Sequence, residues 1–153
     1  TYDIVILDVE LPDFCPISVW KISELRVWVS DYSHMLMHSG QNWLEHLFGQ
    51  PGFPKDLVFH KLFIQAVDCG VEEAYLWEYM NRFPALWQPE PYVLPWDEGQ
   101  LALKLENEHK KQLLLKPLSR IYKRELCRCI GEWMSWEIKE SRRALKRAER
   151  RRA

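Results

Sequence analysis

Apolar residues recur at helical spacing through most of the chain, which predicts a largely helical protein. We expect helices over residues 24–38, 54–69, 72–83, 97–115 and 118–150. Ser23, Pro54 and Asp97 suit the starts of three of these helices, and Gly40, Gly70 and Pro84 suit the ends. Residues 25–30 also alternate between apolar and polar side chains, so a strand is the competing interpretation of that segment.

Two segments depart from the helical pattern. Residues 2–11 read YDIVILDVEL, a run rich in Ile and Val that ends at Pro12, and this predicts a strand. Residues 17–22 are the best candidate to pair with it. Residues 84–96 contain four prolines, which predicts an ordered, extended connector. The predicted fold class is therefore mainly α: a helical domain with an N-terminal β-strand or small hairpin and a long basic C-terminal helix.

The stretch IVILDVELPD, residues 4–13, resembles the third strand of a response-regulator receiver domain, where an Asp accepts a phosphoryl group. The resemblance implies that Asp8 is the acceptor. The glycine that the family carries soon after this stretch is missing, and Phe14, Cys15 and Pro16 stand there instead. No acidic pair precedes the strand, and no alternation of strands and helices follows it. The chain is therefore not assigned to that family.

Charge divides the chain into two parts. Residues 117–153 hold twelve Lys/Arg and five Asp/Glu, a net of +7, whereas residues 1–116 hold nine Lys/Arg and seventeen Asp/Glu, a net of −8. We expect an acidic, Trp-rich helical domain over residues 1–138 and a basic helical extension over residues 139–153. This asymmetry points to a charged partner. No apolar run approaches the ~18 residues that cross a bilayer, so we expect no membrane span.

No catalytic, cofactor-binding or metal-binding motif is evident in the sequence. His34 and His38 share a predicted helix face, but the Glu of a H-E-x-x-H metal motif is missing, so we expect a solvated polar face. We expect reduced thiols rather than two disulfides, as in an intracellular protein with a large apolar core. The four cysteines are Cys15, Cys69, Cys127 and Cys129.

The eight tryptophans are many for a chain of this length. Tryptophan is enriched at protein interfaces, and a core rich in large side chains is the alternative. We expect the partner-binding residues to be Trp133, Trp136, Arg142, Arg143, Lys146, Arg147, Arg150 and Arg151. The sequence favours a non-catalytic, intracellular assembly or adaptor subunit of a larger complex, without a cofactor. A nucleic-acid-binding protein that uses the basic helix is one alternative, and an enzyme whose site is not visible as a motif is the other.

Overall fold

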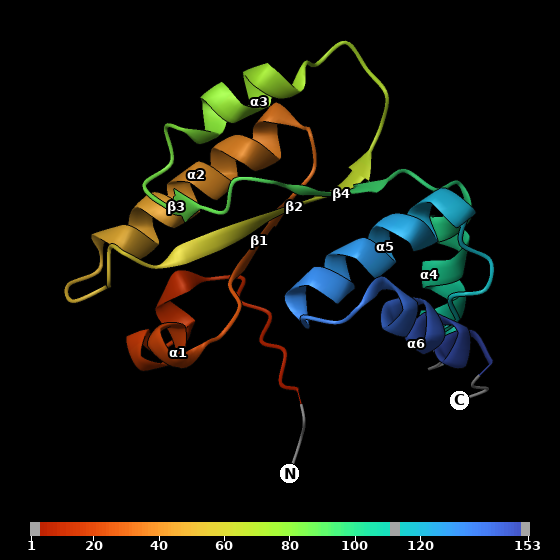
Figure 1. The fold of residues 1–153 in the computed structure, drawn as a ribbon. Helices are drawn as coiled ribbons and strands as arrows, with labels where there is room; N and C mark the ends of the chain where they lie inside the picture. Colours follow the sequence, from red (N-terminus) through yellow and green to blue (C-terminus); the bar gives the residue numbers. More distant parts are fainter. Residues whose placement is uncertain (1–3, 111–113, 151–153) are drawn as a thin grey trace. The chain divides into compact units, whose positions relative to one another are not determined.

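The computed structural model describes residues 4–110 and 114–150, and these form a mixed α/β protein. Four of the described segments make one sheet with parallel strand pairing, in which β2 (Val58–Ala66) is the strand that pairs with the others. The predicted mainly-α class with a small hairpin is therefore wrong. Parallel strands need long crossover connections, and helices supply them here (Figure 1).

Contacts divide the chain into two units that share β2. One unit comprises Thr1–Lys61 and Gly70–Pro89, and the other comprises Leu62–Cys69 and Glu90–Ala153. The division predicted at residue 138 rests on charge, which contacts do not test, so it stays a prediction. Each unit is described by itself below.

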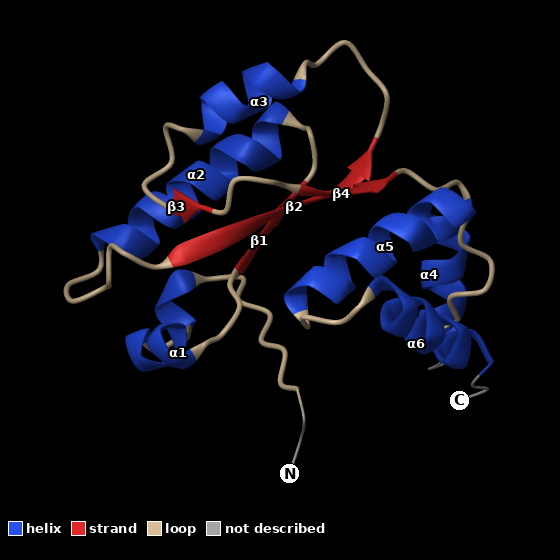
Figure 2. Cartoon of the chain, in the orientation of Figure 1, coloured by secondary structure: helices blue, strands red, loops and turns tan. Residues whose placement is uncertain are grey.

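In the first unit, β1 and β3 pair with β2, and helices connect the strands (Figure 2). Val58 pairs with Leu86 and Phe59 with Trp87, and His60 N donates to Arg26 O at 2.8 Å. The elements are the 3₁₀ turn η1 (Pro12–Phe14), α1 (Ile17–Ile22), β1 (Val27–Ser30), α2 (His34–Gly49), the first half of β2, α3 (Glu73–Met80) and β3 (Leu86–Trp87).

Aromatic side chains fill the core of this first unit. Trp28 is buried between Phe83 and Trp87, with ring centroids 5.6 and 5.9 Å away at steep angles. Rings at these distances and angles make favourable edge-to-face contacts. Gly40 of α2 lies against the same indole, because a Cβ added there would come within 2.7 Å of Trp28 Cζ2. The glycine therefore lets α2 approach β1 closely.

The second unit contains the end of β2, β4 (Tyr92–Pro95), α4 (Gly99–Lys110), α5 (Arg120–Trp133) and α6 (Ile138–Arg150). β4 pairs with β2 from Leu62↔Tyr92 to Ala66↔Pro95, with an irregularity between Phe63 and Ala66. Its apolar core is small. The core residues are Leu94, Leu103, Leu118 and Tyr122, with Leu62, Ile64, Leu114, Leu115 and Leu126 packed around them.

One carboxylate joins the starts of two helices in the second unit. Asp97 Oδ1 accepts from Gly99 N at 3.0 Å, and Asp97 Oδ2 accepts from Ser119 N at 2.7 Å. Ser119 in turn caps α5, since its Oγ accepts from Tyr122 N at 3.2 Å. These hydrogen bonds, led by those from Ser119, lower the pKa of Asp97. The predicted cap of α4 by Asp97 is confirmed, and the bond to Ser119 could not be read from the sequence.

The N-terminal strand is not present in the described residues. Residues 4–9 form no strand, and Ile4, Val5, Ile6 and Leu7 are 55–88% exposed. Residues 17–22, its expected partner, form α1 instead. A strand needs a partner for its backbone groups, and β propensity alone does not supply one. The segment is nevertheless anchored just after this run, where Glu10 O accepts from Trp43 Nε1 at 2.8 Å.

Two predicted helices are also strands or contain one. Within residues 24–38, the competing strand interpretation is confirmed for β1, and α2 begins only at His34, capped by Ser33. The helix predicted over residues 54–69 is β2. Phe59, Lys61 and Phe63 are all buried at a spacing of two, as in a strand. Because Lys61 is charged, it hid the alternation of buried and exposed positions that would have indicated a strand.

The predictions for residues 72–83 and 84–96 agree with the structure. The helix expected over residues 72–83 is confirmed as α3, and its end lies near Pro84 as expected. The connector over residues 84–96 is extended as predicted, and its two short stretches β3 and β4 pair with β2.

Candidate functional site

The predicted partner-binding residues lie on a helical hairpin rather than on one long helix. α5 ends at Trp133 and α6 begins at Ile138, and the turn between them contains Ser135 with a positive φ of 54°. Trp136 N donates to Gly131 O at 2.8 Å, which closes the turn. The prediction of a single long helix over residues 118–150 is therefore wrong (Figure 1).

Gly131 is the residue that lets the two helices of the hairpin touch. A Cβ added at Gly131 would lie 2.6 Å from Ser141 Oγ and 3.5 Å from Trp136 O. Ser141 itself is only 3% exposed. A side chain at residue 131 would thus occupy the space that α6 now fills.

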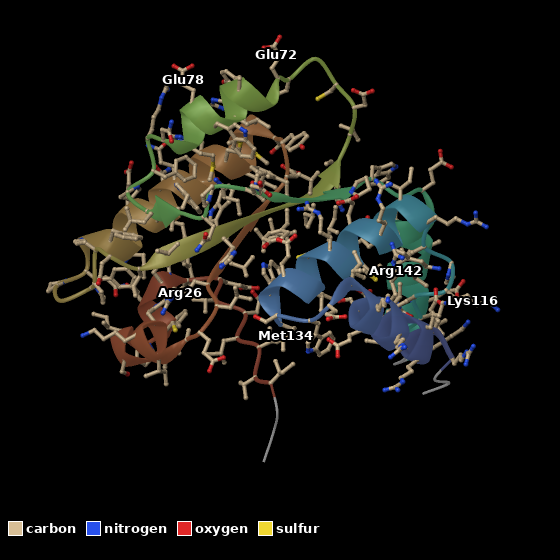
Figure 3. The ribbon with its side chains drawn as sticks, viewed as in Figure 1. Arg26, Glu72, Glu78, Lys116, Met134 and Arg142 are labelled. Atoms are coloured by element: carbon tan, nitrogen blue, oxygen red, sulfur yellow. The ribbon has the colours of Figure 1, made fainter. Side chains whose placement is uncertain are left out.

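An ion pair joins the other end of the hairpin. Lys123 Nζ on α5 lies 2.6 Å from Glu149 Oε1 on α6, and both side chains are about four-fifths buried. Because Lys123 precedes Gly131 while Glu149 follows Ser141, the two helices run antiparallel. Figure 3 labels Met134 at the turn and Arg142 on α6. The hairpin is therefore fastened at both ends, and α6 is held in one orientation.

This orientation exposes a stripe of positive charge, which we call the basic face. At 100° per residue its members span an arc of about 140°, and the apolar residues Ala144, Leu145 and Ala148 lie opposite. Among the described residues, none of its members forms a salt bridge. Arg151 was predicted to belong to this face and lies outside the described residues. The basic face consists of Lys139, Arg142, Arg143, Lys146, Arg147 and Arg150, all exposed.

The two predicted interface tryptophans occupy different surroundings. Trp133 packs against Tyr92 with ring centroids 5.3 Å apart. Tyr92 Oη donates to Glu132 Oε2 at 2.7 Å, and the Arg128 guanidinium lies 5.3 Å from the Tyr92 ring. Burial, followed by the Glu132 carboxylate, raises the pKa of Tyr92. Trp133 thus has a packing role inside its unit, and a role in partner binding stays a prediction.

Trp136, in contrast, is 40% exposed and stands directly before α6. Ile138 and Ile130, at the same turn, are 51% and 36% exposed. Three partly exposed large apolar residues thus stand at this turn, close in sequence to the charged stripe, and exposed apolar residues of this kind are typical of contact sites. We call Ile130, Trp136 and Ile138 the apolar turn.

A second site, which sequence reasoning missed, lies in the first unit. It is a pocket of about 250 Å³ around the side chain of Lys61. Lys61 is only 6% exposed, and burial lowers its pKa. Its Nζ donates to Pro89 O at 3.3 Å and lies 5.0 Å from the Trp77 ring and 5.9 Å from the Trp87 ring. The remaining lining residues are Met80, Asn81 and Gln88.

A lysine in an apolar row was the sequence signal for this pocket. Residues 58–66 read VFHKLFIQA, and Lys61 stands at a position whose neighbours two residues away, Phe59 and Phe63, are both buried. A strand interpretation of this segment would have placed the ammonium group inside the protein, where lysines are rarely found without a reason.

The other candidate groups do not assemble a reactive site. All four cysteines are free, and burial raises the pKa of Cys129 to about 12, so its thiol stays protonated. His34 and His38 stack with ring centroids 6.4 Å apart, and His46 binds Asp13 at 2.8 Å. In the part of the chain that the structure describes, no three His, Cys, Asp or Glu side chains gather as metal ligands would.

Membrane and family comparisons add two findings. Among residues 4–110 and 114–150, no helix has both the length and the apolar character needed to cross a bilayer. No family model, curated protein or solved structure shows a significant match to this chain.

Proposed function

We propose that the protein is a non-catalytic adaptor or assembly subunit whose α5–α6 hairpin docks on an acidic surface of a partner protein. The observation that carries this proposal is the basic face, whose six exposed cations have no carboxylate partner among the described residues. Side chains of like charge along one helix repel each other, and an acidic partner relieves that repulsion.

The apolar turn favours a protein partner over a nucleic acid. Tryptophan and arginine are the residues that most often dominate the energy of protein interfaces, and here Trp136 stands beside the basic face. Nucleic-acid binding draws its affinity mainly from phosphate contacts, for which isoleucines are of no use. The 13-residue α6 is about 20 Å long, which suits a contact with a groove or helix of a partner.

A fixed hairpin also favours docking over a flexible charged tail. Binding by a disordered tail loses conformational entropy when the tail becomes ordered. Here the Gly131–Ser141 contact and the Lys123–Glu149 ion pair already hold α6 in place. The cations are therefore arranged before the partner arrives, which lowers the entropic cost of binding.

Fluorescence anisotropy with defined probes tests the proposal. The probes are a labelled peptide of alternating Glu and Leu, a peptide of Glu alone and a DNA duplex, each measured between about 50 and 200 mM salt. At the higher salt concentration, we expect the Glu–Leu peptide to bind more tightly than the Glu peptide and the DNA duplex. Arg143→Glu with Arg147→Glu should abolish its binding, while the matched pair Lys21→Glu with Lys116→Glu, also exposed, should not.

A tryptophan variant separates the protein partner from the nucleic acid. Trp136→Ala should weaken the binding of the Glu–Leu peptide about tenfold, or 1.4 kcal/mol. Trp96→Ala, which changes another exposed indole, should leave the affinity for this peptide unchanged. Tighter binding of the duplex, with a steep salt dependence and no response to Trp136→Ala, would show a nucleic-acid-binding protein instead. Circular dichroism of each variant confirms that the fold is retained.

A further inference from the structure

The Lys61 ammonium is short of hydrogen-bond acceptors for a buried charge. An ammonium group has three N–H donors, and among the described residues Lys61 Nζ makes a single hydrogen bond, of 3.3 Å to Pro89 O. Two indole faces, Trp77 and Trp87, complete its surroundings. No carboxylate is among the described residues that line the pocket. Buried charges in proteins are normally paired, so this site has an electrostatic requirement that the described residues do not meet.

The pocket reaches the protein surface, where its polar groups lie. Asn81, Gln88 and Pro89 are exposed lining residues, whereas Lys61 and Met80 are buried. A molecule in the pocket can therefore contact both solvent-exposed amide residues and the buried Lys61. Amide groups can donate to an anion or accept from it, so they do not oppose its entry.

We propose that this pocket binds a small organic carboxylate, with its carboxylate on Lys61 Nζ and its apolar body against Trp77 and Met80. A carboxylate supplies the acceptor oxygens and the negative charge that the ammonium group lacks. The indole and thioether walls match an apolar or aromatic body. The volume of about 250 Å³ lies just below the ~300–1,000 Å³ of pockets for drug-sized ligands, so the ligand is small.

The composition of the pocket favours a carboxylate over a phosphate group. Phosphate sites usually combine several cationic groups or a row of backbone N–H donors, often at a helix N-terminus. Lys61 is the single cation that lines this pocket within the described part of the chain, and the other walls combine two indoles, a thioether and a proline with the two side-chain amides of Asn81 and Gln88. The lowered pKa of Lys61 fits the same picture, because a bound anion restores the charged form that burial disfavours.

Calorimetric titration of the whole protein with benzoate tests the site. Benzamide serves as the neutral analogue and phenyl phosphate as the phosphate analogue. We expect benzoate to bind with a Kd of about 1 mM or tighter and at least about tenfold more tightly than benzamide. Lys61→Met keeps an unbranched side chain that is one atom shorter and removes the charge, so it should abolish the preference for benzoate over benzamide.

A control variant and a second measurement keep the test independent of folding. Lys55→Met removes another lysine that lies over an aromatic ring, Phe48 at 5.5 Å, and should leave benzoate binding unchanged. In the unmodified protein, NMR of the Lys61 side chain should show its pKa rising as benzoate saturates the pocket.

Four results would overturn the proposal. Equal affinity for benzoate and benzamide would show that the charge of Lys61 takes no part in binding. Unchanged benzoate binding by Lys61→Met, or no response of the Lys61 side chain during the titration, would place any binding elsewhere. Tighter binding of phenyl phosphate than of benzoate would make the pocket a phosphate site.

Discussion

Replacing Gly131 by alanine gives a sharp test of the α5–α6 hairpin. The new Cβ would lie 2.6 Å from Ser141 Oγ, well inside the 3.4 Å at which ordinary van der Waals contact begins. Ser141 is buried and its Oγ donates to Glu137 O at 3.5 Å, so the hydroxyl has little room to move away. Either α6 shifts outward or the Ser141 side chain changes rotamer. Both outcomes disturb the contact that positions the basic face.

The expected magnitude follows from two opposing effects. Overpacking a close contact costs about 1–3 kcal/mol, while alanine gains about 0.8–1 kcal/mol over glycine in a helix interior. We therefore expect a net loss of about 1 kcal/mol in the free energy of unfolding. In a chain of 153 residues this corresponds to a fall of about 3 °C in Tm.

A double-mutant cycle with Ser141 isolates the contact. Ser141→Ala removes Oγ and leaves the two Cβ atoms 3.6 Å apart, an ordinary contact distance. In that background Gly131→Ala should stabilise the protein, because only the helix-propensity gain remains. The coupling between the two substitutions should reach about 1 kcal/mol or more, as measured by urea unfolding followed by circular dichroism.

Gly49→Ala is the matched control for this experiment. Gly49 is helical and exposed, and a Cβ added there meets no atom within 4 Å. We expect it to cause no loss of stability. If Gly131→Ala alone stabilises the protein and shows no coupling to Ser141, the two helices do not pack as described.

Three further substitutions test the packing and the ionisation of the two units. Gly40→Ala places a Cβ 2.7 Å from Trp28, whose indole is held by aromatic neighbours, so we expect a loss of about 1–3 kcal/mol in urea unfolding; an unchanged midpoint would contradict the packing of α2 on β1. Tyr92→Phe removes the 2.7 Å hydrogen bond to Glu132 and should cost about 1–3 kcal/mol. The pKa of Tyr92 in the folded protein lies above 10.0, so the contribution of its hydroxyl to the free energy of unfolding is complete below pH 10.0 and is lost as the pH rises further. The stability of the Tyr92→Phe variant should therefore fall less than that of the parent protein when unfolding is measured at alkaline pH. Asp97→Ala should lower the free energy of unfolding by about 0.5–2 kcal/mol, since two helix starts lose an acceptor. Because the pKa of Asp97 is lowered in the folded protein, this stabilisation is present above pH 3.8 and disappears as the pH falls through the folded pKa. Unfolding of the variant and the parent protein at a series of acidic pH values measures this loss.

The sequence identified those elements whose signals are local. α3 was predicted from the spacing of its apolar residues and from Pro84 after its end, and the helix start near Asp97 from its capping side chain. The extended character of residues 84–96 followed from their prolines. Each of these signals acts within a few residues of the element that it determines.

Elements that depend on distant contacts were missed. β2 has the sequence of an apolar helix face once Lys61 is counted as polar, and only the pairing with β3 and β4 makes it a strand. The break between α5 and α6 depends on Gly131 meeting Ser141 across the hairpin, a contact between residues ten positions apart that the helical spacing of apolar residues does not indicate. Tertiary contacts override local propensity in both cases.

The candidate sites divide in the same way. Five of the six cations of the basic face, all except Lys139, were among the predicted partner-binding residues because charge clusters are visible in one dimension, and the structure adds that they share one exposed helix face. The Lys61 pocket brings together residues 61, 77 and 87–89, which no spacing rule connects. Its detection required the fold.

The exposed run Ile4-Val5-Ile6-Leu7 has a consequence for the behaviour of the purified protein. A short segment with high β propensity, no charge and no proline is typical of sequences that nucleate amyloid-like stacking. Asp8 and Glu10 follow it and act as gatekeepers, because stacking identical chains in register would align their carboxylates. Asp8→Asn with Glu10→Gln removes this repulsion, so the variant should form fibrils more readily than the parent protein at high concentration, which thioflavin fluorescence would detect.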